Sequence, residues 1–223
     1  MKKTLTLLLS LGLFAITSLA NAATTFTTTN SSTSTVANAY YTGFRLNLDP
    51  SLANSRLTTA STPASTSIPQ YVQLDSISTN IRRITAGTNT NTELFLALAD
   101  SSGNVISMSD GVSQIGEVTW NFTNTTISTT ENLYFYFVKD SNISTVTSDS
   151  LIAAGSSTLI NYGDKSGTDS LTLIGGDNTS MSINNQNYAT KLVIKTSPIP
   201  EPSTATLGLL GLGALMMRRR RQS

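Results

Sequence analysis

Short apolar runs recur about every ten residues through the middle of this chain, and Gly, Asn, Asp and Ser stand between them, as in strands joined by turns. In Glu117–Thr123 the side chains alternate, so Val118, Trp120 and Phe122 share one face and polar groups share the other. No segment within residues 23–197 shows a clear period of about 3.6 residues, which an amphipathic helix needs. The pattern therefore restricts the folded part to short antiparallel strands.

Other segments of the chain share these strand signals. We expect further strands at Tyr71–Ile77, Asn80–Ala86, Leu94–Ala99, Val105–Met108, Asn132–Val138, Leu171–Ile174 and Lys191–Ile194. The run Leu94–Ala99 is apolar on both faces, which indicates a central strand buried on two sides. Asp100–Asn104 supplies a hairpin loop into the next strand. The most aromatic strand places Phe135 on one side and Tyr134 and Tyr136 on the other.

This spacing predicts an all-β fold, an antiparallel β-sandwich assigned to residues 39–196. A jelly roll is the expected form by analogy with carbohydrate-binding modules and lectins of this size, and such an analogy says little about function. Residues 23–38 are of low complexity and are expected to form a lead-in before the sandwich. Thr58–Pro69, rich in Ser, Thr and Pro, predicts a long loop.

Residues 1–22 have the three parts of a secretory signal peptide. Lys2 and Lys3 form the basic start, and Leu5–Leu19 forms the apolar stretch, expected to be helical. Residues 20–22, Ala-Asn-Ala, have the small-x-small pattern of a cleavage site. We therefore expect the chain to be exported.

A second terminal segment spans residues 197–223. Its proline-rich spacer contains Pro200, Glu201 and Pro202, and an uncharged run follows at residues 203–217. A cationic cluster then consists of Arg218, Arg219, Arg220 and Arg221. A helix of 15 residues rises roughly 22 Å, short of a hydrocarbon layer of roughly 30 Å, so flanking side chains must reach the interfaces of a short transmembrane helix. The arginines stay on the cytoplasmic side, which places the preceding domain outside.

The order of Pro200-Glu201-Pro202, apolar run and arginine cluster resembles the PEP-CTERM sorting signal of Gram-negative bacteria. The resemblance implies that an exosortase recognises Pro200, Glu201 and Pro202, that Arg218–Arg221 act as a retention cluster, and that the inner membrane holds the protein transiently. Delivery to the cell surface or the extracellular matrix would follow. The alternative is a membrane-tethered surface protein that is never cut. A glycolipid-anchor signal does not normally end in an arginine block.

The charge of the exported part differs from that of the whole chain. Six of the 14 basic residues lie in the two terminal segments, and one of the 13 acidic residues is Glu201. The remaining eight basic and twelve acidic residues give residues 23–197 a net charge of −4. We therefore expect no nucleic-acid partner. The chain has no cysteine, so no disulfide supports the fold.

Most catalytic constellations are excluded by composition. The chain contains neither histidine nor cysteine, which rules out Ser-His-Asp and Cys-His sets and the usual zinc sites. No motif supports a Ser-Lys pair. Two carboxylates acting on a glycosidic bond remain formally available, and a surface glycoside-active enzyme is therefore the alternative function. The sequence assigns no catalytic residue, and we expect no enzyme.

Calcium is the cofactor to consider for this composition, because it needs only oxygen ligands. The loops Asp100–Asn104, Asp164–Asp169 and Gly175–Asn178 carry suitable oxygens, but none matches the EF-hand loop or a calcium-binding repeat. Asp and Gly are also what ordinary β-turns require. No metal site is therefore assigned.

Carbohydrate is the expected ligand class, with exopolysaccharide as the partner. Aromatic faces stack on sugar rings, and carboxylates and amides hydrogen-bond hydroxyls. Tyr134 and Tyr136 are the candidates, because they face away from Phe135, although they can equally pack a second apolar layer. Trp120 is assigned to the core. The sequence thus favours an exported structural or adhesive protein that binds glycans weakly.

Overall fold

The computed structural model describes residues 23–28, 35–36, 40–52, 55, 57–62, 67–81, 83–85, 93–155, 159–161, 171–174 and 188–199. All regular secondary structure in these ranges is β-strand, as predicted. The strands are β1 (Ala23–Thr28), β2 (Thr35–Val36), β3 (Tyr40–Tyr41), β4 (Gly43–Leu46), β5 (Leu57–Thr62), β6 (Tyr71–Ile81), β7 (Arg83–Thr85), β8 (Phe95–Ala99), β9 (Val105–Met108), β10 (Gly116–Ser128), β11 (Leu133–Val138), β12 (Ala153–Gly155), β13 (Leu159–Asn161), β14 (Leu171–Ile174), β15 (Tyr188–Thr190) and β16 (Val193–Ser197). The expected signal helix and C-terminal helix lie outside the described residues.

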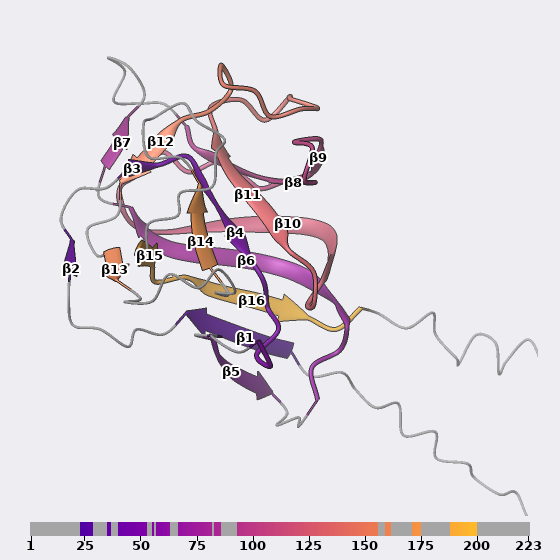
Figure 1. Ribbon diagram of the computed structural model, residues 1–223. Helices are drawn as coiled ribbons and strands as arrows, with labels where there is room; N and C mark the ends of the chain where they lie inside the picture. Colours follow the sequence, from indigo (N-terminus) through magenta and orange to yellow (C-terminus); the bar gives the residue numbers. More distant parts are fainter. Residues whose placement is uncertain are drawn as a thin grey trace, which may run out of the picture.

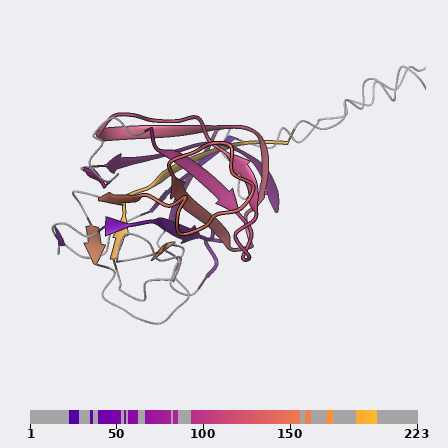
Figure 2. The ribbon, with the colours of Figure 1, turned by 90° about the horizontal axis from the view of Figure 1, so that it is seen from above.

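Ten of these strands form two antiparallel sheets of five strands each. The first sheet has the order β10-β6-β16-β1-β5, and the second has the order β14-β4-β11-β8-β9. In Figure 1 the strands β6, β16 and β1 run nearly horizontally, and β4, β11 and β14 cross them steeply. Seen from above (Figure 2), the strands again lie in separate layers, with β10 in pink at one side. Two three-stranded sheets, β3-β12-β7 and β15-β13-β2, complete the described strands.

One apolar core joins the two large sheets. Phe26, Ile77, Trp120 and other side chains of the first sheet are buried in one cluster with Phe44 and Phe137 of the second. The ring centroids of Trp120 and Phe137 lie 5.5 Å apart. Because side chains from the facing surfaces of both sheets fill this core, the sheets stabilise each other chiefly by burying apolar area.

Eight strands pair in a nested series that runs from the ends of the domain to its middle. β1 pairs with β16, β4 with β11, β6 with β10, and β8 with β9. Two further pairs, β16 with β6 and β11 with β8, join the series into the two sheets. β5 and β14 extend the sheets beyond β1 and β4.

The central strands of the second sheet, β8 and β11, are covered on both faces. Residues 139–152 lie over the outer face of this sheet, where Val146 and Leu151 are buried with Ala97, Ala99 and Tyr136. This segment is held by backbone hydrogen bonds such as that from the Val146 amide to the Gly103 carbonyl, at 2.8 Å. Covering on both faces explains why the central strands β8 and β11 carry apolar or aromatic side chains on both sides.

Two sequence predictions about individual strands are confirmed. In β10 the side chains of Val118, Trp120 and Phe122 point into the core and are at most 7% exposed. In β8, Leu96 and Leu98 belong to the main core, while Ala97 and Ala99 belong to the outer cluster. The strand is therefore buried on two sides, as the unbroken apolar run indicates.

The structure differs from the sequence-based expectation at two threonine-rich segments. Ala23–Thr28, expected to belong to the lead-in, form β1 between β16 and β5. Its Phe26 is fully buried, and the Thr28 hydroxyl accepts a hydrogen bond of 2.8 Å from the Leu192 amide. Leu57–Thr62, most of which was expected in a loop, form the edge strand β5. Threonine is β-branched and suits strands, so these polar sequences pair wherever a neighbouring strand is available.

Candidate functional site

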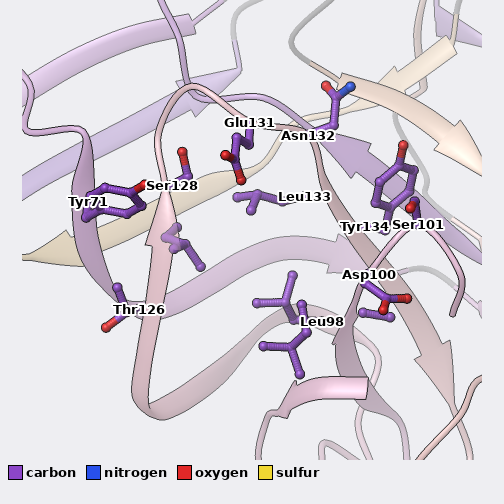
Figure 3. Close-up of a pocket in the computed structure, with 13 residues that line it drawn as sticks. Tyr71, Leu98, Asp100, Ser101, Thr126, Ser128, Glu131, Asn132, Leu133 and Tyr134 are labelled. Carbon is purple, nitrogen blue, oxygen red and sulfur yellow. The ribbon is translucent and has the colours of Figure 1, made fainter. Parts of the chain in front are cut away.

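A pocket of about 390 Å³ opens where the two sheets meet at one end of the domain (Figure 3). Its walls come from the start of β6, the β8–β9 hairpin, the end of β10 and the loop into β11. The lining residues are Tyr71, Leu98, Ala99, Asp100, Ser101, Ile106, Thr126, Ile127, Ser128, Glu131, Asn132, Leu133 and Tyr134.

The floor of the pocket is apolar and its rim is polar or aromatic. Leu98, Ile127 and Leu133 are at most 8% exposed and form part of the main core. Tyr71, at 50% exposure, stands on the rim at the first residue of β6. Figure 3 places Tyr71 and Tyr134 on opposite sides of the pocket, with Glu131 between them.

An irregularity in β10 sets which side chains reach this pocket. The register of β10 with β6 shifts between Asn121 and Thr125, and Asn124 adopts a positive φ of 51°. Up to Phe122, the even-numbered residues of β10 face the core. After the shift, Thr125 and Ile127 face the core, and Thr126 is exposed. The bulge is held from the side by a carboxylate on the loop after β9.

That carboxylate is Asp110. Its Oδ1 accepts a hydrogen bond of 2.7 Å from the Asn121 amide, and its Oδ2 accepts one of 2.7 Å from the Asn121 side chain. The Asp110 amide in turn donates to the Asn121 carbonyl at 3.0 Å. Three hydrogen bonds between one pair of residues fix the point where β10 changes face.

The loop from β10 to β11 is fixed at both of its sides. Thr129 donates from its hydroxyl to the Pro69 carbonyl at 2.9 Å, and from its amide to the Gln70 carbonyl at 2.8 Å. On the other side the amide of the Asn47 side chain donates to Asn132 Oδ1 at 3.2 Å. These contacts position Glu131 at the mouth of the pocket.

The two tyrosines predicted to bind sugar lie on the outer face of the second sheet, as their alternation with Phe135 indicates. Tyr134 is half-buried and lines the pocket. Tyr136 is only 4% exposed, because residues 139–152 cover it, and it is not part of the pocket wall. Burial raises the pKa of the Tyr136 phenol, and the nearby Tyr134 and Asp100 raise it further. In this conformation the Tyr136 ring has no free face on which a sugar can stack.

Asp100 is an acidic residue of the pocket wall and begins the β8–β9 hairpin. Its Oδ1 accepts hydrogen bonds from the amides of Ser102 and Asn104 at 2.8 and 2.9 Å, and its Oδ2 accepts one of 2.8 Å from the Asn104 side chain. These bonds, that of the Asn104 side chain first, lower the pKa of Asp100. The carboxylate therefore stays ionised at neutral pH. Because the pocket wall contains a second carboxylate, Glu131, and no Lys or Arg, it is electronegative.

The hairpin Asp100–Asn104 was one of three loops considered for calcium. Its carboxylate oxygens serve the amides of the loop itself, as in an ordinary tight turn, and Gly103 supplies the positive φ of 87°. Within the described part of the chain, no three acidic side chains are grouped to hold a metal ion. The loops Asp164–Asp169 and Gly175–Asn178 lie outside the described residues.

Sequence reasoning missed Tyr71 and Glu131 as members of one site. Tyr71 was predicted as the first residue of a strand, and Glu131 was given no role. The pocket joins segments about 60 residues apart, because β6 and β10 pair with each other. The only sequence signal for this site was Tyr71 itself, an aromatic residue at the start of a predicted strand, where a side chain can project beyond the sheet.

The sorting residues begin where the described chain ends. Pro198 and Ile199 follow β16 directly, and Ile199 is 36% exposed. Pro200, Glu201 and Pro202 and the cluster Arg218–Arg221 lie outside the described residues. Over the residues that are described, no helix is long and apolar enough to cross a bilayer.

Comparison with known proteins bears on this last segment. No curated protein and no solved structure matches the chain. A scan against protein families matches residues 198–221 to the PEP-CTERM protein-sorting motif. This confirms the resemblance of the terminal segment. The chain therefore carries, directly after the central strand β16, a PEP-CTERM sorting signal, which implies an exported surface protein sorted by exosortase.

Proposed function

We propose that this protein is a non-enzymatic adhesive component of the cell surface or extracellular matrix, and that it binds polysaccharide in the pocket between Tyr71 and Tyr134. The observation that carries the proposal is the combination of two accessible tyrosine rings with hydroxyl, amide and carboxylate groups around an apolar floor. Sugar rings present apolar faces and hydroxyl edges, and such a wall offers partners for both.

Asp100 is suited to accept hydrogen bonds from a ligand. The hydrogen bonds from Asn104 and Ser102 lower its pKa and keep its carboxylate ionised. An ionised carboxylate accepts hydrogen bonds from sugar hydroxyls, which suits a binding site.

The fold supports the same class of function. The nested pairing of β1 with β16, β4 with β11, β6 with β10 and β8 with β9 is the pairing expected when a long antiparallel hairpin rolls up, and we assign the domain as a jelly roll on this basis. Jelly rolls occur in lectins, although the fold alone does not decide function.

Affinity electrophoresis of the purified protein in gels that contain neutral or acidic polysaccharides tests the proposal. Retention by at least one neutral polysaccharide is expected for the native protein. Tyr71→Ala removes the exposed ring and should weaken retention about tenfold, whereas Tyr71→Phe keeps the ring and should retain it. Ile115→Ala changes a side chain that is 64% exposed and lies outside the pocket, and it serves as the control.

Two outcomes would remove the proposal. One is the absence of retention in every polysaccharide gel by a protein that is folded by circular dichroism. The other is retention that Tyr71→Ala and Tyr134→Ala leave unchanged. Sugar release from a polysaccharide by the purified protein would instead favour the alternative, a surface enzyme that uses paired carboxylates.

A further inference from the structure

The strand β5 is an open edge of the first sheet. Its residues Leu57–Thr62 pair with β1 on one side, and within the described part of the chain no strand pairs with the other side. Thr58, Thr59 and Ala60 are exposed in succession, so both faces of the strand are open to solvent at its centre. Figure 1 shows β5 below β1, at the lower side of the domain. The backbone of β5 is therefore accessible to another strand.

The pairing of β1 determines which backbone groups of β5 point outward. The Thr28 amide donates a hydrogen bond of 3.1 Å to the carbonyl of Leu192, which precedes β16. Hydrogen-bonding direction alternates along a strand, so Thr28 faces β16 and Thr27 faces β5. Thr27 lies opposite Thr58, which therefore bonds inward to β1. The residues of β5 whose amides and carbonyls point outward are the alternate ones, Leu57, Thr59 and Ser61.

The opposite edge of the same sheet, β10, is protected against pairing. Asp110 accepts a hydrogen bond from the amide of Asn121 and donates one to its carbonyl. The register shift beside Asn124 bends the same strand. Bulges, prolines and charged side chains are the usual means by which sheets prevent edge pairing. β5 contains no charged residue, no proline and no register shift, so of these two edges it is the one suited to strand addition.

We propose that β5 pairs with β5 of a second copy of this chain, antiparallel and with Thr59 opposite Thr59 at the two-fold axis. In this register Leu57 lies opposite Ser61 of the second copy. Every outward amide of one strand then meets an outward carbonyl of the other, and each of these residue pairs exchanges two backbone hydrogen bonds. The pairing joins two five-stranded sheets into one continuous sheet.

The chemistry of β5 favours its own copy as the partner. Because the strand is uncharged, its antiparallel copy places no like charges opposite each other. Its threonines are β-branched, and threonine pairs across neighbouring strands are favourable. A two-fold contact closes on itself, and the protected edge β10 does not extend it, so the product is a dimer and not a fibre. One pair of short strands buries less area than a standard interface, and we therefore expect a weak, reversible dimer.

A dimer of this kind carries its two pockets at opposite ends of the joined sheet. β5 and β10 are the two edges of the first sheet, so nine strand spacings of about 4.8 Å, or roughly 43 Å, separate the two β10 strands. Two pockets on one particle can bind the same polysaccharide twice or link two polysaccharide chains, which strengthens weak single contacts. This consequence rests on the proposed function, whereas the strand pairing does not.

Single cysteines test the pairing and its register, because the natural sequence contains no cysteine. In the dimer the two copies of Thr59→Cys have Cα atoms about 5.5 Å apart, within the range of a disulfide. Ser61→Cys is the matched control, because its two copies are displaced by roughly 13 Å along the strands. Each purified full-length variant is oxidised with copper phenanthroline, and the disulfide-linked dimer is quantified on non-reducing gels. Association through the terminal segments would affect both variants alike.

Thr59→Cys should form the linked dimer at least tenfold faster than Ser61→Cys. Equal rates, or faster linkage of Ser61→Cys, would overturn the proposed pairing. Since the assay contains no sugar, its failure is distinguishable from a failure of glycan binding.

A proline variant tests the same contact without a cross-link. Thr59→Pro removes an outward amide that β1 does not use, and it should abolish the dimer that the native protein forms in analytical ultracentrifugation. Thr59→Val keeps the amide and should keep the dimer. Identical sedimentation of the native protein and a folded Thr59→Pro variant would also overturn the proposal. Circular dichroism verifies folding, and the cysteine variants decide the question if the proline variant does not fold.

Discussion

Trp120 of β10 packs against Phe137 of β11 across the centre of the core, with ring centroids 5.5 Å apart and ring planes at 36°. The indole Nε1 of Trp120 donates a hydrogen bond of 3.0 Å to the Leu94 carbonyl, which precedes β8. One fully buried side chain thus links the first sheet to two neighbouring strands of the second.

Trp120→Phe should lower the free energy of unfolding by about 2–4 kcal/mol, because it removes the hydrogen bond and leaves part of the indole volume empty. Urea unfolding followed by far-ultraviolet circular dichroism measures the change without relying on the lost indole fluorescence. Ile115→Ala, at a 64% exposed position, should change stability by less than about 0.5 kcal/mol. Equal effects of the two substitutions would contradict the central place of Trp120.

Gly43→Ala should destabilise the protein strongly, by more than about 2 kcal/mol. A Cβ at Gly43 would collide with the backbone carbonyl of Phe135, on the paired strand β11, and the backbone cannot move aside without breaking the pairing. Gly111→Ala is the matched comparison, since its Cβ meets only the flexible side chain of the exposed Glu93. Thermal unfolding should therefore separate the two variants by several degrees.

Phe26→Ala should cost about 3–5 kcal/mol, because Phe26 is fully buried in the core between the sheets. Thr25→Ala, on the opposite face of the same strand, should cost less than about 1 kcal/mol. Urea denaturation of both variants measures the difference. A small effect of Phe26→Ala would mean that Ala23–Thr28 are dispensable, as a lead-in outside the domain would be.

The β8–β9 hairpin should make stability depend on pH through Asp100. Its pKa is lowered in the folded state from the ordinary value of 3.8, so its contribution is fully present above that value and is lost as the pH falls through the lowered pKa. Asp100→Asn should therefore destabilise the protein at pH 7 and have a diminishing effect below about pH 4. Asn104→Ala removes the largest cause of the shift and should flatten the same dependence. Urea unfolding of the native protein and of each variant at pH 7 and below about pH 4 measures the change. An equal loss of stability in Asp100→Asn at the two pH values would contradict the role of Asp100.

Glu201→Ala should prevent processing at the sorting signal and leave the protein in the membrane fraction with its C-terminal residues intact. The charged Glu201 stands between two prolines and is the polar group that a processing enzyme can recognise. The intact mass of the protein recovered from native cells reveals whether the tail is present. Glu117→Ala, an exposed glutamate at the far end of β10, should be processed normally.

The strands that sequence predicted well were those in which burial imposes a visible pattern. Val118, Trp120 and Phe122 alternate because one face of β10 meets the core and the other meets water. The unbroken run at Leu94–Ala99 likewise reflects covering on two faces. A sequence pattern of this kind reflects the burial of the side chains directly, and for that reason the structure confirms the strands predicted from it.

The elements that sequence did not predict depend on neighbours that are remote along the chain. β1 and β5 are threonine-rich and resemble a mobile segment until β16 supplies a partner for β1. The burial of Tyr136 depends on residues 139–152, whose docking over the second sheet leaves no periodic signal. The pocket combines Tyr71 with Glu131 through the pairing of β6 with β10, and neither residue carries a motif.

The position of β16 has a consequence for the timing of folding. Thr28 and Leu192 are joined by a hydrogen bond although 164 residues separate them, and without β16 the first sheet falls into two unconnected pairs of strands. Closing so long a loop is entropically costly and slow. If the chain is secreted from its N-terminus, β1 emerges long before its partner β16. We therefore expect the first sheet to remain incomplete during export and to close only when β16, which directly precedes the sorting signal, has emerged.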